Sequence, residues 1–174
     1  ESARQTVARL KKGRRAEELE QFALNDSMTG MYNRNAYDYF VKNEKDFEGY
    51  VIVTFDLNNL KQCNDQYGHR AGDEYIINAA HIIEDNFERY GKCYRIGGDE
   101  FCCIIPKGRF FKIERVMHKI NQDVEILNHK NIIPVPVGIA YGYAVFTADD
   151  TDPEKVRERA DKDMYRNKNT MKQL

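Results

Sequence analysis

The chain has 174 residues, of which 32% are charged and 41% hydrophobic, a balance typical of one folded domain with helices and strands. Its formal net charge of -1 argues against a nucleic-acid partner, which would require a basic surface. No apolar run is long enough to cross a bilayer, so we expect no membrane contact by this segment and a cytoplasmic location. The four cysteines form no C-x-x-C pair, which argues against a zinc site or a disulfide framework and indicates small buried side chains.

Residues 1–24 are charged and helix-prone, and Gly13 interrupts any heptad pattern. Two interpretations stay open: a solvated helix, or the end of a signalling helix that pairs with its twin in a dimer. Because the chain begins with Glu1 and not Met, we expect it to belong to a longer protein with an upstream sensor and possible membrane anchor. We therefore expect a linker helix over 1–24 and a folded domain over 25–174.

The remaining chain alternates between helical periodicity and short runs of β-branched and aromatic residues. The longest amphipathic helix should bury Ile76, Ile77, Ala80 and Ile83. This order predicts an α+β fold in which helices flank a mainly antiparallel sheet, as in polymerase palms and nucleotide cyclases. The expected elements are a turn capped by Asp26 or Ser27, helix 33–42, strand 50–57, helix 60–66, turn 67–69, helix 71–90, hairpin 93–105, helix 110–128, extended segment 132–146, and a last helix capped by Asp152 with Pro153 in its first position.

The hairpin contains the turn Gly97-Gly98-Asp99-Glu100 between two apolar runs. We expect the paired glycines to adopt the positive φ angles of a tight primed turn and to leave their N–H groups accessible to a ligand. Asp99 and Glu100 are adjacent in extended chain, so their carboxylates should point to opposite faces and serve different purposes. The neighbouring Cys102 and Cys103 should face opposite sides for the same reason.

Another carboxylate, Asp56, lies at the end of the nearly all-apolar run 51–57. A buried carboxylate without a partner costs several kcal/mol, so Asp56 should have a cation partner. Because Mg²⁺ is commonly held by one or two carboxylates plus substrate phosphates, Asp56 and Asp99 together predict a metal site. The alternative is an ion pair between Asp56 and Lys61 or Lys162, whereas Lys168 is expected to be solvated.

Five ordered motifs carry a resemblance to a known family. The run Arg95-Ile96-Gly97-Gly98-Asp99-Glu100-Phe101 resembles the signature of the GGDEF family, the diguanylate cyclases. Residues 26–34 resemble its entry motif, 55–73 its first strand and guanine-reading block, and 160–168 its closing helix. Ala140-Tyr141-Gly142 resembles its later strand motif, with Ala140 where Ser is usual. The resemblance covers roughly residues 25–170.

The resemblance implies condensation of two GTP molecules into cyclic di-GMP with release of two pyrophosphates. Each 3′-hydroxyl would attack the α-phosphate of the other GTP across a homodimer. Asp56, Asp99 and the Leu57 carbonyl would hold two Mg²⁺ or Mn²⁺ ions, and Glu100 would support the metal site or the 3′-hydroxyl. The implied catalytic residues are Asp99, Glu100, Asp56 and Lys61.

The resemblance also implies a guanine-reading pair, Asn64 and Asp73. Asp73 would accept hydrogen bonds from guanine N1–H and the N2 amine, which adenine lacks. Taken alone, Asp73 would be read as a favourable charge at a helix N-terminus. The implied phosphate-binding groups are the side chains of Lys61, Lys162 and Arg166 and the backbone N–H groups of Gly97 and Gly98.

Other functions stay open beside the cyclase. The domain could be an inactive GTP-binding regulatory module, although all the signature residues are present, which favours an enzyme. A palm-type polymerase or single-nucleotide cyclase is a weaker option, and the absence of basic charge argues against the polymerase.

Many family members carry Arg-x-x-Asp before the signature, where product binds and inhibits. Glu88 and Gly91 stand at those positions, so we expect no product inhibition there.

Overall fold

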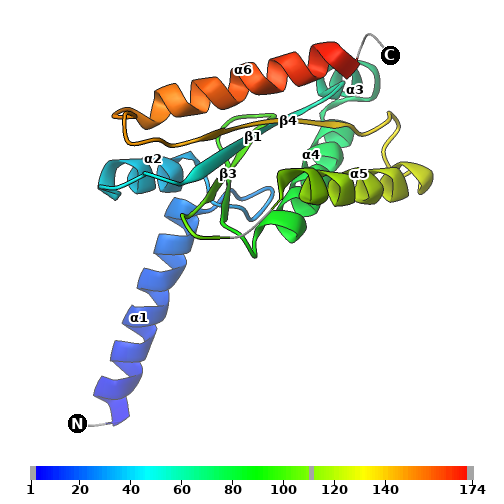
Figure 1. The fold of residues 1–174 in the computed structure, drawn as a ribbon. Helices are drawn as coiled ribbons and strands as arrows, with labels where there is room; N and C mark the ends of the chain where they lie inside the picture. The colour runs from blue at the N-terminus through cyan, green and yellow to red at the C-terminus, as the bar shows by residue number, and fades with distance from the viewer. Residues whose placement is uncertain (1–2, 110–111, 172–174) are drawn as a thin grey trace.

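The computed structural model describes residues 3–109 and 112–171. Figure 1 shows helices on both faces of a central sheet, with α1 projecting away from the body of the domain. The expected helix at the N-terminus and the expected hairpin are confirmed. The elements are α1 (Ala3–Leu24), α2 (Arg34–Asn43), β1 (Val51–Leu57), α3 (Leu60–Tyr67), α4 (His69–Phe87), β2 (Lys92–Arg95), β3 (Glu100–Ile105), α5 (Ile113–His129), β4 (Ile139–Val145) and α6 (Pro153–Met171).

The sheet has the strand order β2-β3-β1-β4, and every pairing is antiparallel. The predicted α+β fold with a mainly antiparallel sheet is therefore confirmed. β1 lies inside the sheet, where Asp56 is directly opposite Glu100 on β3 and Ala140 on β4. The register thus places the end of the buried strand beside the start of the strand that follows the Gly-Gly turn.

The two faces of the sheet carry separate hydrophobic cores, as the alternation of side chains along a strand requires. One core joins Val53 and Phe55 to α3, α4 and α5. The other joins Ile52 to α2 and α6. Ile76, Ala80 and Ile83 are buried as expected, whereas Ile77 is half-buried. Cys103 lies in the first core and Cys102 in the second, which confirms that they face opposite sides.

Helix α6 runs along the open edge of β4 and satisfies backbone groups there (Figure 1). Arg159 donates to the Val145 carbonyl at 2.9 Å, and Asn167 donates to the Tyr141 carbonyl at 3.2 Å. Between them, the Tyr143 N–H donates to the Asp163 carboxylate at 3.1 Å. An exposed strand edge invites pairing with another chain, so these contacts both protect β4 and fix the position of α6.

Gly142 is what lets α6 lie so close to β4. A Cβ at this position would overlap the Met164 nitrogen and the Ala160 carbonyl. The glycine is therefore required for close approach of helix and strand and not for its backbone angles. The helix begins as expected, with the Asp152 side chain accepting from the Glu154 N–H at 3.0 Å and Pro153 in the first helical position.

Several expected boundaries differ from the structure: α3 ends at Tyr67 and α4 spans His69–Phe87, where a turn over 67–69 and a helix over 71–90 were expected. Only 139–145 of the expected extended segment 132–146 is a strand, because Pro134 and Pro136 cannot donate to a ladder. The Asn128 side chain instead ties this segment to α5 through both backbone groups of Val137, at 3.0 and 2.8 Å. The expected start of the preceding helix at Phe110 lies outside the described residues.

The helices of the described residues include none with the length and apolar composition that a membrane span requires.

Replacing Gly142 with Ala should lower the thermal midpoint, because α6 must move away from β4 to make room. Overpacking of this kind costs about 1–3 kcal/mol. Differential scanning calorimetry measures the effect. Gly13→Ala is the matched control: nothing lies within 4 Å of a Cβ there, so that variant should melt no lower than the parent. An unchanged midpoint in Gly142→Ala would contradict the close packing of α6.

Candidate active site

The Gly-Gly turn is wider than expected. The N–H groups of Ile96 and Gly97 both donate to the Glu100 carbonyl, at 2.9 and 3.3 Å, so three residues form its tip. The expectation of positive φ at Gly97 and Gly98 is wrong, because this wider reversal does not need it. The surroundings of the two glycines differ. A Cβ at Gly97 would lie 3.1 Å from Oε2 of Glu100, and Gly98 faces open space, where a ligand can approach its backbone.

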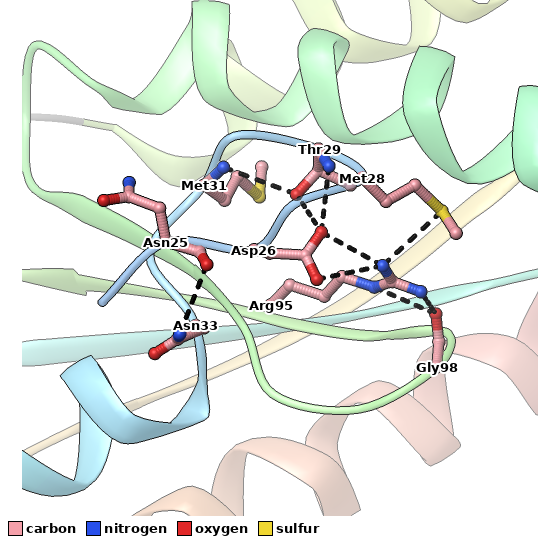
Figure 2. Close-up of polar contacts among 8 residues, drawn as sticks. All are labelled: Asn25, Asp26, Met28, Thr29, Met31, Asn33, Arg95 and Gly98. Carbon is pink, nitrogen blue, oxygen red and sulfur yellow. Dashed lines mark hydrogen bonds and ion pairs between the residues drawn. The ribbon is translucent and has the colours of Figure 1, made fainter. Parts of the chain in front are cut away.

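The side chain of Arg95 holds this turn against the segment that precedes α2 (Figure 2). Its Nη2 donates to the Gly98 carbonyl at 2.9 Å, and its Nη1 donates to the Asp26 carboxylate at 3.0 Å. Asp26 also accepts from the Thr29 N–H and hydroxyl, at 2.9 and 2.8 Å. The expected capping by Asp26 is confirmed, but its pairing with Arg95 was not predicted from the sequence.

This network is largely enclosed: 12% of the Arg95 side chain and 21% of the Asp26 side chain are exposed. Burial disfavours the Asp26 carboxylate, but the hydrogen bonds from Thr29 and Arg95 outweigh it and lower the pKa of Asp26. The ion pair therefore persists at neutral pH and fixes the position of the Gly98 carbonyl relative to the first loop of the domain.

Asp56 forms an ion pair with Lys168 of α6, which confirms the expected cation partner. The expectation that Lys168 is solvated is wrong: 27% of its side chain and 23% of the Asp56 side chain are exposed. Lys168 lies one helical turn beyond Met164, which packs over Gly142, so the register of α6 on β4 brings it to Asp56. Lys61 and Lys162 are exposed, and neither takes part in an ion pair within the described part of the chain.

Asp56 and Glu100 lie directly opposite each other at the end of β1, and Asp99 precedes Glu100 in the turn. Side chains directly opposite in antiparallel strands have Cβ atoms about 4.5–5.5 Å apart, so Asp56 and Glu100 are close, with Asp99 next in sequence. Like charges in such a pair repel, and Lys168 neutralises part of this charge. Asp99 is half-buried, whereas Glu100 is exposed.

The donor chemistry of this cluster suits Mg²⁺ or Mn²⁺. Carboxylate oxygens and the adjacent Leu57 carbonyl are the hard oxygen ligands that these ions take. Within residues 3–109 and 112–171, no group of three or more acidic, His or Cys side chains is arranged to hold a metal ion. An ion at Asp56 would therefore need oxygens from a bound substrate beside those of the protein, which is how Mg²⁺ is commonly held.

Helices α3 and α4 bring the expected guanine-reading residues together. A Cβ at Gly72 of α4 would overlap the Asn64 side chain of α3, so the two helices touch at the position before Asp73. Asp73 is exposed and Asn64 is half-buried. Lys61 is exposed on the first turn of α3, within the same loop–helix unit that follows Asp56.

The buried Tyr75 fixes the loop between β1 and α3. Its hydroxyl lies 2.7 Å from the Asn58 carbonyl and 3.1 Å from the Gly138 carbonyl, and it accepts from the Gly138 N–H at 2.8 Å. Burial raises the pKa of Tyr75 to about 12, so it stays a neutral donor. The chain then turns through Asn59 at φ 62°, a left-handed conformation that Asn tolerates. Sequence periodicity marked α4 as amphipathic but gave no sign of this contact.

Lys162 and Arg166 lie on exposed positions of α6, so their assignment as phosphate-binding groups stays a prediction. The same holds for the other proposed contacts with substrate.

The Arg-x-x-Asp motif that binds product in many family members would require Asp in place of Gly91. A Cβ at Gly91 would overlap the Ile104 carbonyl, so the structure leaves no room for Asp at that position.

Comparison with known proteins agrees with the fold and the turn. The family model described as "Diguanylate cyclase, GGDEF domain" matches residues 23–173, so the chain belongs to the GGDEF domain family. Among structures, the coiled coil and GGDEF domain of DgcB from Caulobacter crescentus, solved with c-di-GMP, aligns with a TM-score of 0.76 at 23% identity. That alignment covers 95% of this chain and 92% of DgcB's solved chain, and it shows likeness of fold.

Two curated relatives show the range of proteins that contain such a domain. The chain is 30% identical over 172 residues to the bifunctional diguanylate cyclase/cyclic di-GMP phosphodiesterase MucR of Pseudomonas aeruginosa, covering 94% of this chain and 24% of MucR. It is 29% identical over 160 residues to the diguanylate cyclase DgcS of Shewanella oneidensis, covering 87% of this chain and 52% of DgcS. The chain thus spans a quarter to half of these relatives.

Replacing Asp26 with Asn should destabilise the fold by about 1 kcal/mol near neutral pH, because the charged hydrogen bonds to Arg95 and Thr29 are weakened. Folding lowers the pKa of Asp26. Its contribution is therefore present above the ordinary carboxyl value of 3.8 and is lost as pH falls through the lower folded value.

The difference between parent and Asp26→Asn in urea midpoints should therefore shrink in acid. Asp38→Asn is the matched control, because it breaks an exposed Asp–Arg pair that contributes little. A difference that stays constant from neutral pH into acid would contradict the ionised Asp26–Arg95 pair.

Proposed function

We propose that this domain is a diguanylate cyclase that condenses two GTP molecules into cyclic di-GMP and releases two pyrophosphates. The observation that carries the proposal is the register that sets Asp56 opposite Glu100, beside Asp99, at an open Gly-Gly turn. The family match and the relatives named as diguanylate cyclases give additional support. Each GTP would present its 3′-hydroxyl to the α-phosphate of the other.

Asp56, Asp99 and the Leu57 carbonyl would hold Mg²⁺ or Mn²⁺, two ions per site, with Glu100 in support. When bound, such ions activate the attacking hydroxyl and neutralise charge on the leaving pyrophosphate. Asp99 enters the site from a turn that Arg95 holds in place. Fixed ligand positions matter here because phosphoryl transfer depends mainly on positioning and charge neutralisation.

We also propose a role for Lys168, which was not predicted from the sequence. In the ligand-free protein it neutralises Asp56 and so limits repulsion among the three carboxylates. We propose that Lys168 leaves Asp56 when GTP binds and pairs with a substrate phosphate instead. Its flexible ammonium group suits such an exchange. Lys61, Lys162 and Arg166 are the other proposed phosphate-binding side chains, and Gly97 and Gly98 the proposed backbone donors.

Guanine recognition would fall to Asn64 and Asp73, which the contact between α3 and α4 brings together. Asp73 would accept from N1–H and the N2 amine of guanine. Adenine offers neither donor, so it would leave a carboxylate unpaired in the complex.

A second candidate is a GTP-binding regulatory module without turnover. The Lys168–Asp56 ion pair favours it, because a lysine that remained on Asp56 would exclude a metal ion from that carboxylate. Pyrophosphate release from GTP with Mg²⁺ separates the two functions. The cyclase releases pyrophosphate, whereas the regulatory module binds GTP and releases none.

Asp99→Asn should abolish pyrophosphate release, and Asp56→Asn should do the same, because each removes a proposed metal-ligand charge. The two variants should remain folded: Asp99→Asn removes a negative charge beside Glu100, and Asp56→Asn leaves Lys168 partly exposed, where water can solvate its ammonium group. Circular dichroism checks the fold and a coupled pyrophosphate assay measures turnover. Asp65→Asn, an exposed Asp on α3, serves as the control and should keep parental activity. Near-parental turnover in Asp99→Asn would overturn the metal assignment.

The domain should use GTP and reject ATP, and Asp73→Ser should weaken both GTP use and this preference. Losing a hydrogen-bonded carboxylate typically removes about 1–3 kcal/mol of discrimination. The measurement is kcat/KM for both nucleotides in parent and variant, with Glu74→Ser, the exposed neighbour on α4, as control. Comparable use of ATP by the parent would show that Asp73 does not read guanine.

Specific activity should rise with protein concentration. One domain supplies one carboxylate cluster and one guanine-reading pair, which is a site for one GTP, so two domains must meet about a two-fold axis. Helix α1 would assist as the connector to an upstream sensor, and a strong parallel coiled coil in place of 1–24 should raise activity in dilute solution. Flat specific activity in a species that sediments as a monomer would rule this out.

A further inference from the structure

Two cysteines face each other across the hairpin that carries the signature turn. Cys93 of β2 is directly opposite Cys103 of β3, and their Sγ atoms lie 2.9 Å apart. Both are free thiols, 3% and 0% exposed respectively, and both belong to the core beneath α4 and α5. Neither cysteine is among the residues proposed for catalysis or substrate binding.

The strand register selects this pair from four cysteines. Cys102 is adjacent to Cys103 in sequence but lies in the opposite core, on the α2 and α6 face. Cys63 lies on α3, outside the hairpin. Among the described residues, Cys93 and Cys103 are the cysteines that lie opposite each other on neighbouring strands, so their sulfurs meet without any change in the backbone.

The same register meets the distance requirement of a disulfide. Opposed residues in an antiparallel pair have Cα atoms about 4.5–5.5 Å apart, within the range of about 4.4–6.8 Å that disulfides span. The sulfurs must close from 2.9 Å to about 2.05 Å, a shift that small rotations of the two side chains can supply.

We propose that Cys93 and Cys103 form a reversible cross-strand disulfide when hydrogen peroxide reaches the hairpin. The Cys93 thiolate attacks one peroxide oxygen, which breaks the O–O bond, gives a sulfenic acid and releases hydroxide, which is protonated to water. The Cys103 sulfur then attacks the sulfenic sulfur, forms the S–S bond and releases a second water after proton transfer. Two thiols lose two hydrogens in all, and one peroxide is reduced to two waters.

Access to the pair comes from the shortness of β2. This strand has four residues and lies at an edge of the sheet, where the Tyr32 backbone bonds the Cys93 carbonyl at 3.2 Å and the Arg95 N–H at 2.8 Å. Local opening must break these two bonds and the short ladder with β3. Burial raises the pKa of the Cys103 thiol, which protects it while the hairpin is closed. The reaction should therefore be slower than that of an exposed thiol, and the product should close a ring around Gly97, Gly98, Asp99 and Glu100.

The experiment treats the folded protein with hydrogen peroxide, blocks the remaining thiols, and analyses tryptic peptides by mass spectrometry. We expect a linked species of the peptides 93–95 and 96–107, lighter by two hydrogens than the reduced pair and released by a thiol reductant. The oxidised protein should melt roughly 5–10 °C higher, because the bond restricts the unfolded chain.

Two matched variants identify the second sulfur within peptide 96–107. Cys102→Ala keeps both partners and should still form the link, whereas Cys103→Ala should lose it. Should Cys103→Ala fail to fold, a link retained in Cys102→Ala still identifies Cys103 as the second sulfur, and its loss in Cys93→Ala identifies Cys93 as the first. A link that disappears in Cys102→Ala, oxidation to sulfinic acid without a link, or no reaction before the protein unfolds would each overturn the proposal. A linked form that melts below the reduced protein would also overturn it, because the bond would then not fit this hairpin.

Discussion

The site depends on how closely α6 lies along β4. Gly142 permits this approach, and side chains of α6 bond the open edge of the strand at Val145, Tyr143 and Tyr141. Arg159, Asp163 and Asn167 make these contacts in turn, so the register of helix and strand is fixed over about two helical turns. Lys168 follows from that register, and it supplies the positive charge that the carboxylate cluster requires.

The signature turn is held from its other side by the Asp26–Arg95 pair. Arg95 is the last residue of β2, and its guanidinium bonds both the turn and the segment before α2 (Figure 2). The turn is therefore tied to the start of the domain, a segment far from it in sequence. This tie also explains why Gly97 and Gly98 need no unusual backbone angles, since side-chain contacts define the turn.

Patterns that depend on near neighbours in sequence were predictable. The buried strand β1, the amphipathic α4, the Asp152-Pro153 helix start and the opposite faces of Cys102 and Cys103 all follow from periodicity or capping. The demand of Asp56 for a cation also followed from the cost of burying charge. The identity of that cation did not, because Lys61, Lys162 and Lys168 have the same chemistry and only the register of α6 separates them. Likewise, the Asp26–Arg95 pair and the Tyr75 hydroxyl network join residues whose proximity only the folded chain creates.

We propose that Asp56 is a metal ligand and that Lys168 and a metal ion compete for its carboxylate. Titration of the nucleotide-free protein with Mn²⁺, followed through the electron paramagnetic resonance of the free ion, measures this competition. Lys168→Met should bind Mn²⁺ several-fold more tightly than the parent, because the competing charge is gone, and Asp56→Asn should lose this binding. Lys162→Met, which removes an exposed lysine from the same helix, should match the parent. Equal or weaker Mn²⁺ binding by Lys168→Met, with the fold intact, would contradict the account.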